Sequence, residues 1–157
     1  MTPEERLTAL EQIEAIKALK HRYFRACDAK DPDTFRACFT AAADIDYGPL
    51  GGFTDADQLA QVFTRIALRK VDGKPVILDM HHGMHPDITL TGPAAATGCW
   101  TLKFRQLNLI ERTERLLTGE YDDAYVIEDG AWKMARSHFR QLWVITRPLT
   151  DDTTVEI

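Results

Sequence analysis

The stretch "VILDMHHGMHPDITL", residues 76–90, marks the point at which the chain changes from helical to extended patterning. Apolar and β-branched residues flank its histidines on both sides, which favours a strand over a helix. Pro86 also biases the residue before it away from helical backbone angles. We therefore expect the chain to be extended here and to continue as strands towards its C-terminal end.

The segment before this boundary has helical periodicity. Thr2, Pro3 and Glu5 supply an N-cap, a first-turn proline and the second half of a capping box. Apolar residues then recur at steps of three and four, which predicts one long helix with a buried face, ending near Lys30. The residues of this face are Leu10, Ile13, Ile16, Leu19, Tyr23 and Cys27.

Two shorter helices are expected before the boundary. The first follows Asp31 and directs Phe35 and Phe39 into the core. The second begins after "TDAD", residues 54–57, and is a helix whose apolar residues share one face. Those residues are Leu59, Val62, Phe63 and Ile66.

The part of the chain after the boundary reads as strands separated by turn sequences, of which "EDG" at 128–130 is the strongest hairpin signal. Helices followed by antiparallel strands predict an α+β fold, with the helices on one face of a curved sheet. Strict alternation in the strand over 94–110 puts Trp100, Leu102 and Phe104 on the concave face. In the last strand, alternation puts Trp132, Met134, Arg136, His138 and Arg140 on one face and Phe139, Trp143 and Ile145 on the other.

Composition narrows the class of protein. A chain of 157 residues that is 45% hydrophobic and 27% charged fits one domain over residues 1–157, with a polar tail from 146. The net charge of -5, with basic and acidic residues interspersed, argues against a nucleic-acid partner. No secretory signal or membrane-length apolar run is present, so we expect a cytoplasmic protein with no membrane partner. The three cysteines form no CxxC pair and are expected to be small buried residues.

The three histidines at 81, 82 and 85 raise the question of a metal site. His81 and His85 have the i, i+4 spacing of a helical zinc motif, but Gly83 and Pro86 disfavour a helix and no third ligand is evident. We therefore expect no metal. In a strand, His81 and His85 share one face and His82 lies on the other.

Acid–base catalysis by one of these imidazoles requires a hydrogen bond between the ring and a carboxylate, which fixes the tautomer of the ring. Asp28 borders the buried face of the long helix, where an unpaired carboxylate would be costly, so a His or Arg partner from the sheet is expected. The alternative is a solvated Asp28 beside Lys30. Tyr23 would donate either to a substrate oxygen or to the backbone, and Arg140 would hold either an anionic oxygen or a surface carboxylate.

Four segments together resemble the SnoaL-like branch of the nuclear transport factor two superfamily, most closely its bile acid 7α-dehydratase and scytalone dehydratase-like members. They are "IEAIKALKHRYFRACDAKDPDTFRACFT" (13–40), "MHHGMHPDITL" (80–90), "ATGCWTL" (96–102) and "DGAWKMARSHFRQLW" (129–143). The resemblance covers Ile13 to about Ile145. It implies a cone-shaped α+β barrel of three N-terminal helices on a strongly curved sheet, without metal or organic cofactor, in a homotrimer or homodimer. Because large apolar residues occupy both sheet faces, the outer face is the expected contact between subunits.

The resemblance also implies the site. Its catalytic side chains would be His81, Asp28, Tyr23 and Arg140, and His81 is favoured over His82 because it follows Met80. The pocket would be completed by Tyr47, His85, Trp100, Phe104 and His138. At Phe104 the bile acid enzymes have an acidic residue, so this pocket is more apolar.

The implied activity is a dehydratase acting on a small, hydroxylated, hydrophobic carbonyl compound of steroid-like or polyketide-like character. An isomerase or polyketide cyclase would use the same base, and a module that only binds a hydrophobic ligand is the non-catalytic alternative. The combination of Tyr, Asp, His and Arg favours catalysis, because binding alone does not require a matched acid and base.

Overall fold

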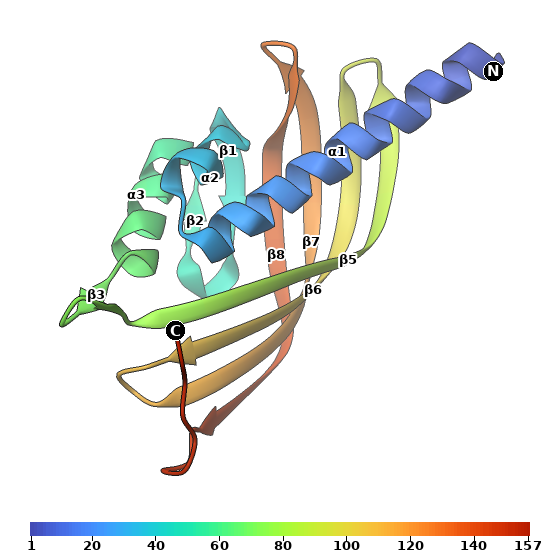
Figure 1. Cartoon of the computed structure of the whole chain (residues 1–157). Coiled ribbons are helices and arrows are strands. Elements are labelled where there is room, and N and C mark those ends of the chain that lie inside the picture. Colours follow the sequence, from blue (N-terminus) through green and yellow to red (C-terminus); the bar gives the residue numbers. More distant parts are fainter.

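The computed structural model describes all residues from 1 to 157 (Figure 1). The helices are α1 (Pro3–Ala29), α2 (Pro32–Ala37) and α3 (Ala56–Ala67), with a 3₁₀ turn η1 (Gly48–Leu50). The strands are β1 (Phe39–Asp46), β2 (Gly52–Phe53), β3 (Lys70–Val71), β4 (Lys74–Pro75), β5 (Ile77–Gly92), β6 (Ala95–Asn108), β7 (Thr113–Glu128) and β8 (Ala131–Pro148). The predicted change from helix to strand is therefore confirmed, since β5 begins at Ile77 and contains the rest of the stretch to residue 90.

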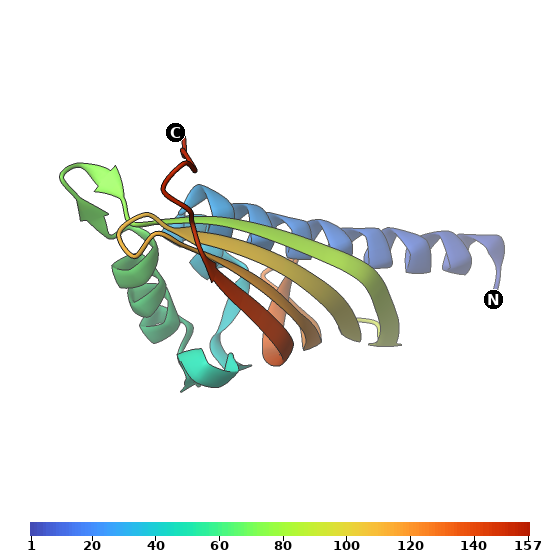
Figure 2. The ribbon, with the colours of Figure 1, turned by 90° about the horizontal axis from the view of Figure 1, so that it is seen from below.

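Six strands form one sheet in the order β2-β1-β8-β7-β6-β5, and β3 and β4 form a separate short hairpin. All neighbours in the large sheet are antiparallel except β1 and β8. The long strands arch together, and α1 runs across their concave side with α3 at one end (Figures 1 and 2). The predicted α+β architecture, with three helices on a strongly curved and mainly antiparallel sheet, is confirmed.

The long helix α1 begins as its sequence predicts. The Thr2 and Glu5 capping box is formed, Pro3 occupies the first turn, and the helix ends at Ala29. Ile16, Leu19, Tyr23 and Cys27 are buried on the predicted face. Leu10 is 61% exposed, contrary to prediction, because the first turns of the helix extend past the end of the sheet (Figure 2).

Two extra residues in β8, Ala135 and Leu142, change the predicted alternation of that strand. Ala124 of β7 pairs with Arg136, whereas its neighbour Tyr125 pairs with Met134, so Ala135 forms a bulge. A bulge reverses which side chains face the core, because strand side chains alternate with a period of two.

The consequence is that Trp132 and Met134 lie in the core, while the side chains between the two bulges exchange faces. Gly119 pairs with Gln141 and Thr118 with Trp143, so Leu142 is the second bulge, and the side chains after it return to the predicted faces. Between the bulges, Phe139 faces the concave side, opposite Tyr121, and His138 and Arg140 face outwards, opposite Asp122 and Glu120. The expectation that His138 and Arg140 share the face of Met134 is therefore wrong.

The last strand also continues further than the sequence suggests. β8 runs to Pro148, so the polar tail expected from residue 146 begins at Leu149. Arg112 donates hydrogen bonds to the carbonyl oxygens of Thr150 and Thr153, which ties this segment to the turn between β6 and β7. No helix in the chain has both the length and the apolar character needed to cross a membrane.

Candidate active site

A cavity of about 400 Å³ lies between the helices and the concave face of the sheet. Sixteen of its 22 lining residues are hydrophobic, which is typical of a pocket for a small organic molecule. The apolar wall comes from α3 and from strands β5 to β8, and includes Leu59, Val62, Phe63, Ile66, Leu102, Phe104, Leu117 and Phe139. The predicted apolar face of α3 therefore faces the cavity.

Asp28 and His81 meet at one wall of this cavity. Asp28 lies in the last turn of α1, and its Oδ1 is 2.6 Å from Nδ1 of His81 on β5. The backbone N–H of His81 also donates to both carboxylate oxygens, at 3.0 and 3.1 Å. Because β5 is an edge strand, this N–H has no strand partner, and the carboxylate satisfies it. Of the two alternatives for Asp28, the structure shows the paired one.

The geometry of this pair is that of an oriented base. The bond to Asp28 engages Nδ1 and leaves Nε2 of His81, whose ring lines the cavity, without a protein partner. The side chains of His81 and Asp28 are only 15% and 20% exposed, so solvent screens their interaction weakly. The rings of Phe24 and Phe104 flank the imidazole, with centroids 6.0 and 4.6 Å away. Phe104 thus lies against His81.

Buried phenols form a second polar group in the cavity. The hydroxyl of Tyr23 donates to that of Tyr47 at 2.9 Å, and Tyr47 in turn lies 3.5 Å from the hydroxyl of Ser137. Tyr121 lines the same region. Burial raises the pKa values of Tyr23, Tyr47 and Tyr121 above the ordinary value for tyrosine, so their hydroxyls remain proton donors at neutral pH.

Two of the expected site residues on β8 lie outside the cavity. Arg140 is 75% exposed and pairs with Glu120 at 2.6 Å, and His138 pairs with Asp44 at 2.9 Å. The bulge at Ala135 turns both of them to the outer face of the sheet, where they contact carboxylates. This placement corrects the expectation that they line the pocket.

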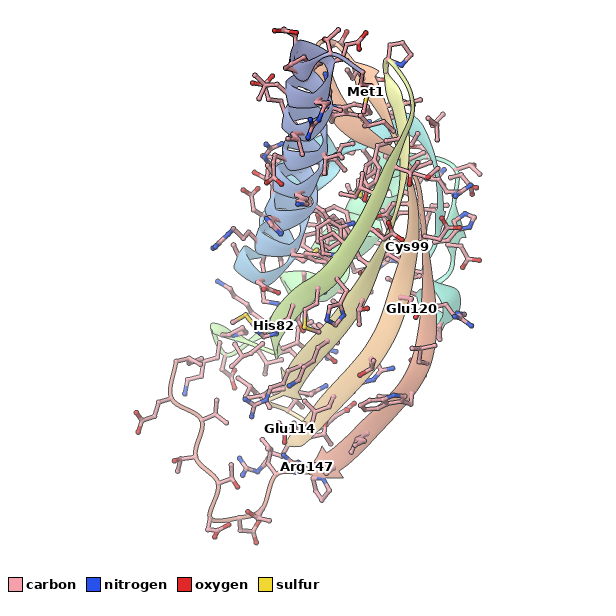
Figure 3. All side chains as sticks on the ribbon, turned by 90° about the vertical axis from the view of Figure 1, so that its right-hand side faces the viewer. Met1, His82, Cys99, Glu114, Glu120 and Arg147 are labelled. Carbon is pink, nitrogen blue, oxygen red and sulfur yellow. The ribbon has the colours of Figure 1, made fainter.

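His85 also departs from prediction. It has a φ of 51° in a bulge of β5, between Met84 and Asp87, and its ring lies 3.4 Å from the hydroxyl of Thr101. His81 and His85 therefore face opposite sides of the sheet and cannot share a metal ion. His82 is exposed on the outer face of β5, as predicted, where it pairs in register with Lys103 on β6 (Figure 3).

Trp100 is on the concave side, as predicted, but belongs to the core beneath α1. It is buried, its indole N–H donates to the hydroxyl of Tyr125 at 3.0 Å, and it does not line the cavity of His81. Sequence reasoning therefore places five of nine expected residues at the cavity: Tyr23, Tyr47, His81 and Phe104 line it, and Asp28 lies directly behind His81.

Sequence reasoning missed the polar side chains at one end of the cavity. Asp79, Gln106 and Arg115 line that end, together with Gln141. Each of the first three is two residues from a cavity residue on its own strand, so alternation alone could have placed them.

A buried ion pair between Lys20 and Asp123 was also missed. Their charged atoms lie 2.7 Å apart and both side chains are fully buried. The ammonium is 3.7 Å from the ring centroid of Tyr121, close to the phenols of the cavity. Burial lowers the pKa of Lys20, and the nearby Asp123 opposes that shift. The position of Lys20, one turn after Ile16 on the buried face, was the available signal.

Comparisons with known proteins agree with this architecture. A family model for the SnoaL-like domain matches residues 8–138. A structure from Novosphingobium aromaticivorans DSM 12444, provisionally named a scytalone dehydratase, aligns with a TM-score of 0.79 at 23% identity, over 95% of this chain and 98% of that one. Hexachlorocyclohexane dehydrochlorinase LinA type 2 aligns with a TM-score of 0.80 at 13% identity, over 96% and 97% of the two chains. The type 3 enzyme from Novosphingobium barchaimii LL02 aligns with a TM-score of 0.78 at 14% identity, over 97% and 99%. At these identities the structural likeness shows the fold.

Proposed function

Because the chain belongs to the SnoaL-like domain family of the nuclear transport factor two-like superfamily, we propose that it is a cofactor-free lyase that removes water from a hydroxylated, hydrophobic carbonyl compound. The observation that carries the proposal is the Asp28–His81 pair at the wall of an apolar cavity. A hydrogen-bonded carboxylate and imidazole, with one ring nitrogen free, form a general base.

The elimination uses both polar groups of the cavity. Nε2 of His81 removes a proton from the carbon α, or vinylogous, to the carbonyl, and Asp28 stabilises the imidazolium that forms. The electron pair of the broken C–H bond forms the new double bond as the C–O bond breaks. The departing hydroxyl takes the proton that His81 has gained and leaves as water, which restores the neutral imidazole.

The buried phenols supply the hydrogen-bond donors that this step needs. Tyr23 donates its hydroxyl proton to Tyr47, and Tyr47, which lies 3.5 Å from Ser137, would donate in turn to the carbonyl oxygen or the departing hydroxyl. Arg140 is not available for that purpose, since it lies on the other face of the sheet. Stabilisation of the developing oxyanion by donors fixed in a low-dielectric site is commonly a large contribution to catalysis.

The names of the compared proteins support an elimination. A dehydratase and a dehydrochlorinase each remove a small leaving group together with a proton from a neighbouring carbon. The same apolar cavity and base could serve either reaction, because both begin with proton abstraction.

The test is the mass of the product. Fused-ring β-hydroxy ketones of steroid-like and polyketide-like type are incubated with the wild-type chain and analysed by mass spectrometry. Loss of one water, abolished in His81→Gln and reduced about 10²- to 10⁴-fold in Asp28→Asn, supports the proposal. Asp33→Asn, a change to an exposed carboxylate on α2, is the matched control and should retain activity. A product of unchanged mass would indicate the isomerase or cyclase, and binding without conversion would indicate a ligand-binding module.

A further inference from the structure

The polar end of the cavity is a row of three side chains that crosses three neighbouring strands. Asp79 on β5 pairs in register with Gln106 on β6, which pairs with Arg115 on β7. The adjacent row, two residues along each strand, contains His81, Phe104 and Leu117 in the same way. The polar row therefore lies beside the base, on the same wall of the cavity.

The negative charge in this row is already neutralised. Asp79 accepts a hydrogen bond from Nζ of Lys30 at 3.2 Å and another from Nε2 of Gln106 at 3.0 Å. Its side chain is only 9% exposed, and both of its oxygens are engaged. Asp79 and Lys30 thus form a pair with no net charge, so Asp79 does not need Arg115 as a counter-ion.

The positive charge of Arg115 has no such partner. Its one side-chain hydrogen bond goes to the amide oxygen of Gln141, at 3.3 Å, and no carboxylate lies within 4.0 Å. Every other arginine on β6, β7 and β8 is paired with a carboxylate. Arg105 and Arg147 pair with Glu114, Arg136 with Asp122, and Arg140 with Glu120.

We propose that Arg115 and Gln141 form a subsite for an anionic oxygen group of the substrate, most suitably a carboxylate. A guanidinium presents two parallel N–H donors that match the two oxygens of a carboxylate. The side chain is half-buried in a largely apolar cavity, where an anion would gain more from it than in water. The inference deepens the proposed function, on which it rests, by assigning an acidic group to the substrate.

The sheet geometry fixes where that group lies. Arg115 is two strands and two residues away from His81, which is about 12 Å between backbones at standard strand spacing. Both side chains reach inwards and shorten that separation. The carboxylate is therefore at the end of the substrate remote from the carbon that His81 deprotonates.

The experiment compares two probes of nearly equal shape, 2-naphthoate and the neutral 2-naphthamide, by calorimetric titration of the full chain. We expect the wild-type chain to bind the carboxylate about tenfold or more tightly than the amide, as a charge-assisted hydrogen-bond pair requires. The preference should be lost in Arg115→Gln and largely retained in Arg115→Lys. Arg65→Gln removes the same charge from an exposed position on α3 and should retain the preference.

Three results would overturn the subsite. They are equal or tighter binding of the amide by the wild-type chain, no detectable binding of the carboxylate, or an unchanged preference in Arg115→Gln. His81→Gln should keep the preference for the carboxylate while abolishing turnover. Failure of the proposed lyase activity would therefore leave the anion preference intact, so the two failures are distinguishable.

Discussion

Nδ1 of His81 lies 2.6 Å from Oδ1 of Asp28, and this contact joins the last turn of α1 to the edge strand β5. The same carboxylate accepts the backbone N–H of His81, so Asp28 orients the imidazole and also fixes the strand that carries it. Residues 53 positions apart in the chain thereby form one rigid unit at the cavity wall.

Alkaline pH should unfold the protein, because its four tyrosines all have raised pKa values. Burial is the main cause in each case. The unfolded chain loses these phenolic protons near the ordinary pKa of 10.0 while the folded chain keeps them, so stability is complete below that pH and is lost as the pH rises above it. Tyrosinate absorbance and circular dichroism followed together should change in one transition. Ionisation of all four tyrosines near pH 10 with an unchanged dichroism spectrum would contradict this account.

Gly83→Ala should destabilise the protein. The added methyl group would overlap the ring of Phe24, which packs between α1 and β5 beside His81. Overpacking of this kind costs about 1–3 kcal/mol in the free energy of unfolding, which urea denaturation would measure. Gly92→Ala on the same strand is the matched control, since its methyl group would meet only Ala95, at ordinary contact distance. Equal stability of the two variants would show that Gly83 is not required for this close approach.

Lys20→Met should also be strongly destabilising. It leaves Asp123 as a fully buried carboxylate that keeps its hydrogen bond from Tyr125 but loses its cation, and one of its oxygens already lacks a partner. Breaking such a pair costs about 3–5 kcal/mol. The double variant Lys20→Met/Asp123→Asn should lose less stability than the sum of the two single variants in urea denaturation. Additive losses would mean that the two charges do not interact.

The outer face of the sheet should mediate association of the chain into a homodimer or homotrimer. Met80, Trp143 and Ile145 are large, apolar and exposed there, and patches of this kind commonly mark interfaces. Light scattering should give the mass of two or three chains for the wild type and of one chain for Trp143→Arg. Ile110→Arg, an exposed position in the turn between β6 and β7, should remain associated. A monomeric wild type at micromolar concentration would refute the interface.

Much of the fold follows from local patterns in the sequence. The capping residues predict two helix starts, one at Thr2 with Glu5 and one at Asp55. The turn at Asp129 and Gly130 predicts a hairpin. Hydrogen bonds and side-chain alternation over a few residues determine these features, and the same alternation places Phe104 in the cavity.

The site could be predicted only in part, because bulges in β5 and β8 change which side chains face the cavity. Ala135 adds one residue to β8 and turns Arg140 and His138 outwards, and a bulge at His85 does the same to that histidine. Whether a strand accommodates an extra residue depends on its pairing with the next strand, which the pattern of a single strand does not contain. The burial of Lys20 likewise depends on Asp123, a partner distant in the sequence.

We infer that Asp28 holds His81 with Nδ1 protonated and Nε2 free to act as a base. Nitrogen NMR of the histidine-labelled protein tests it without a substrate, because the two ring nitrogens of a neutral imidazole have distinct shifts. We expect neutral His81 to carry its proton on Nδ1 and Asp28→Asn to disturb this preference. A neutral His81 protonated on Nε2, or a tautomer unaffected by Asp28→Asn, would contradict this inference.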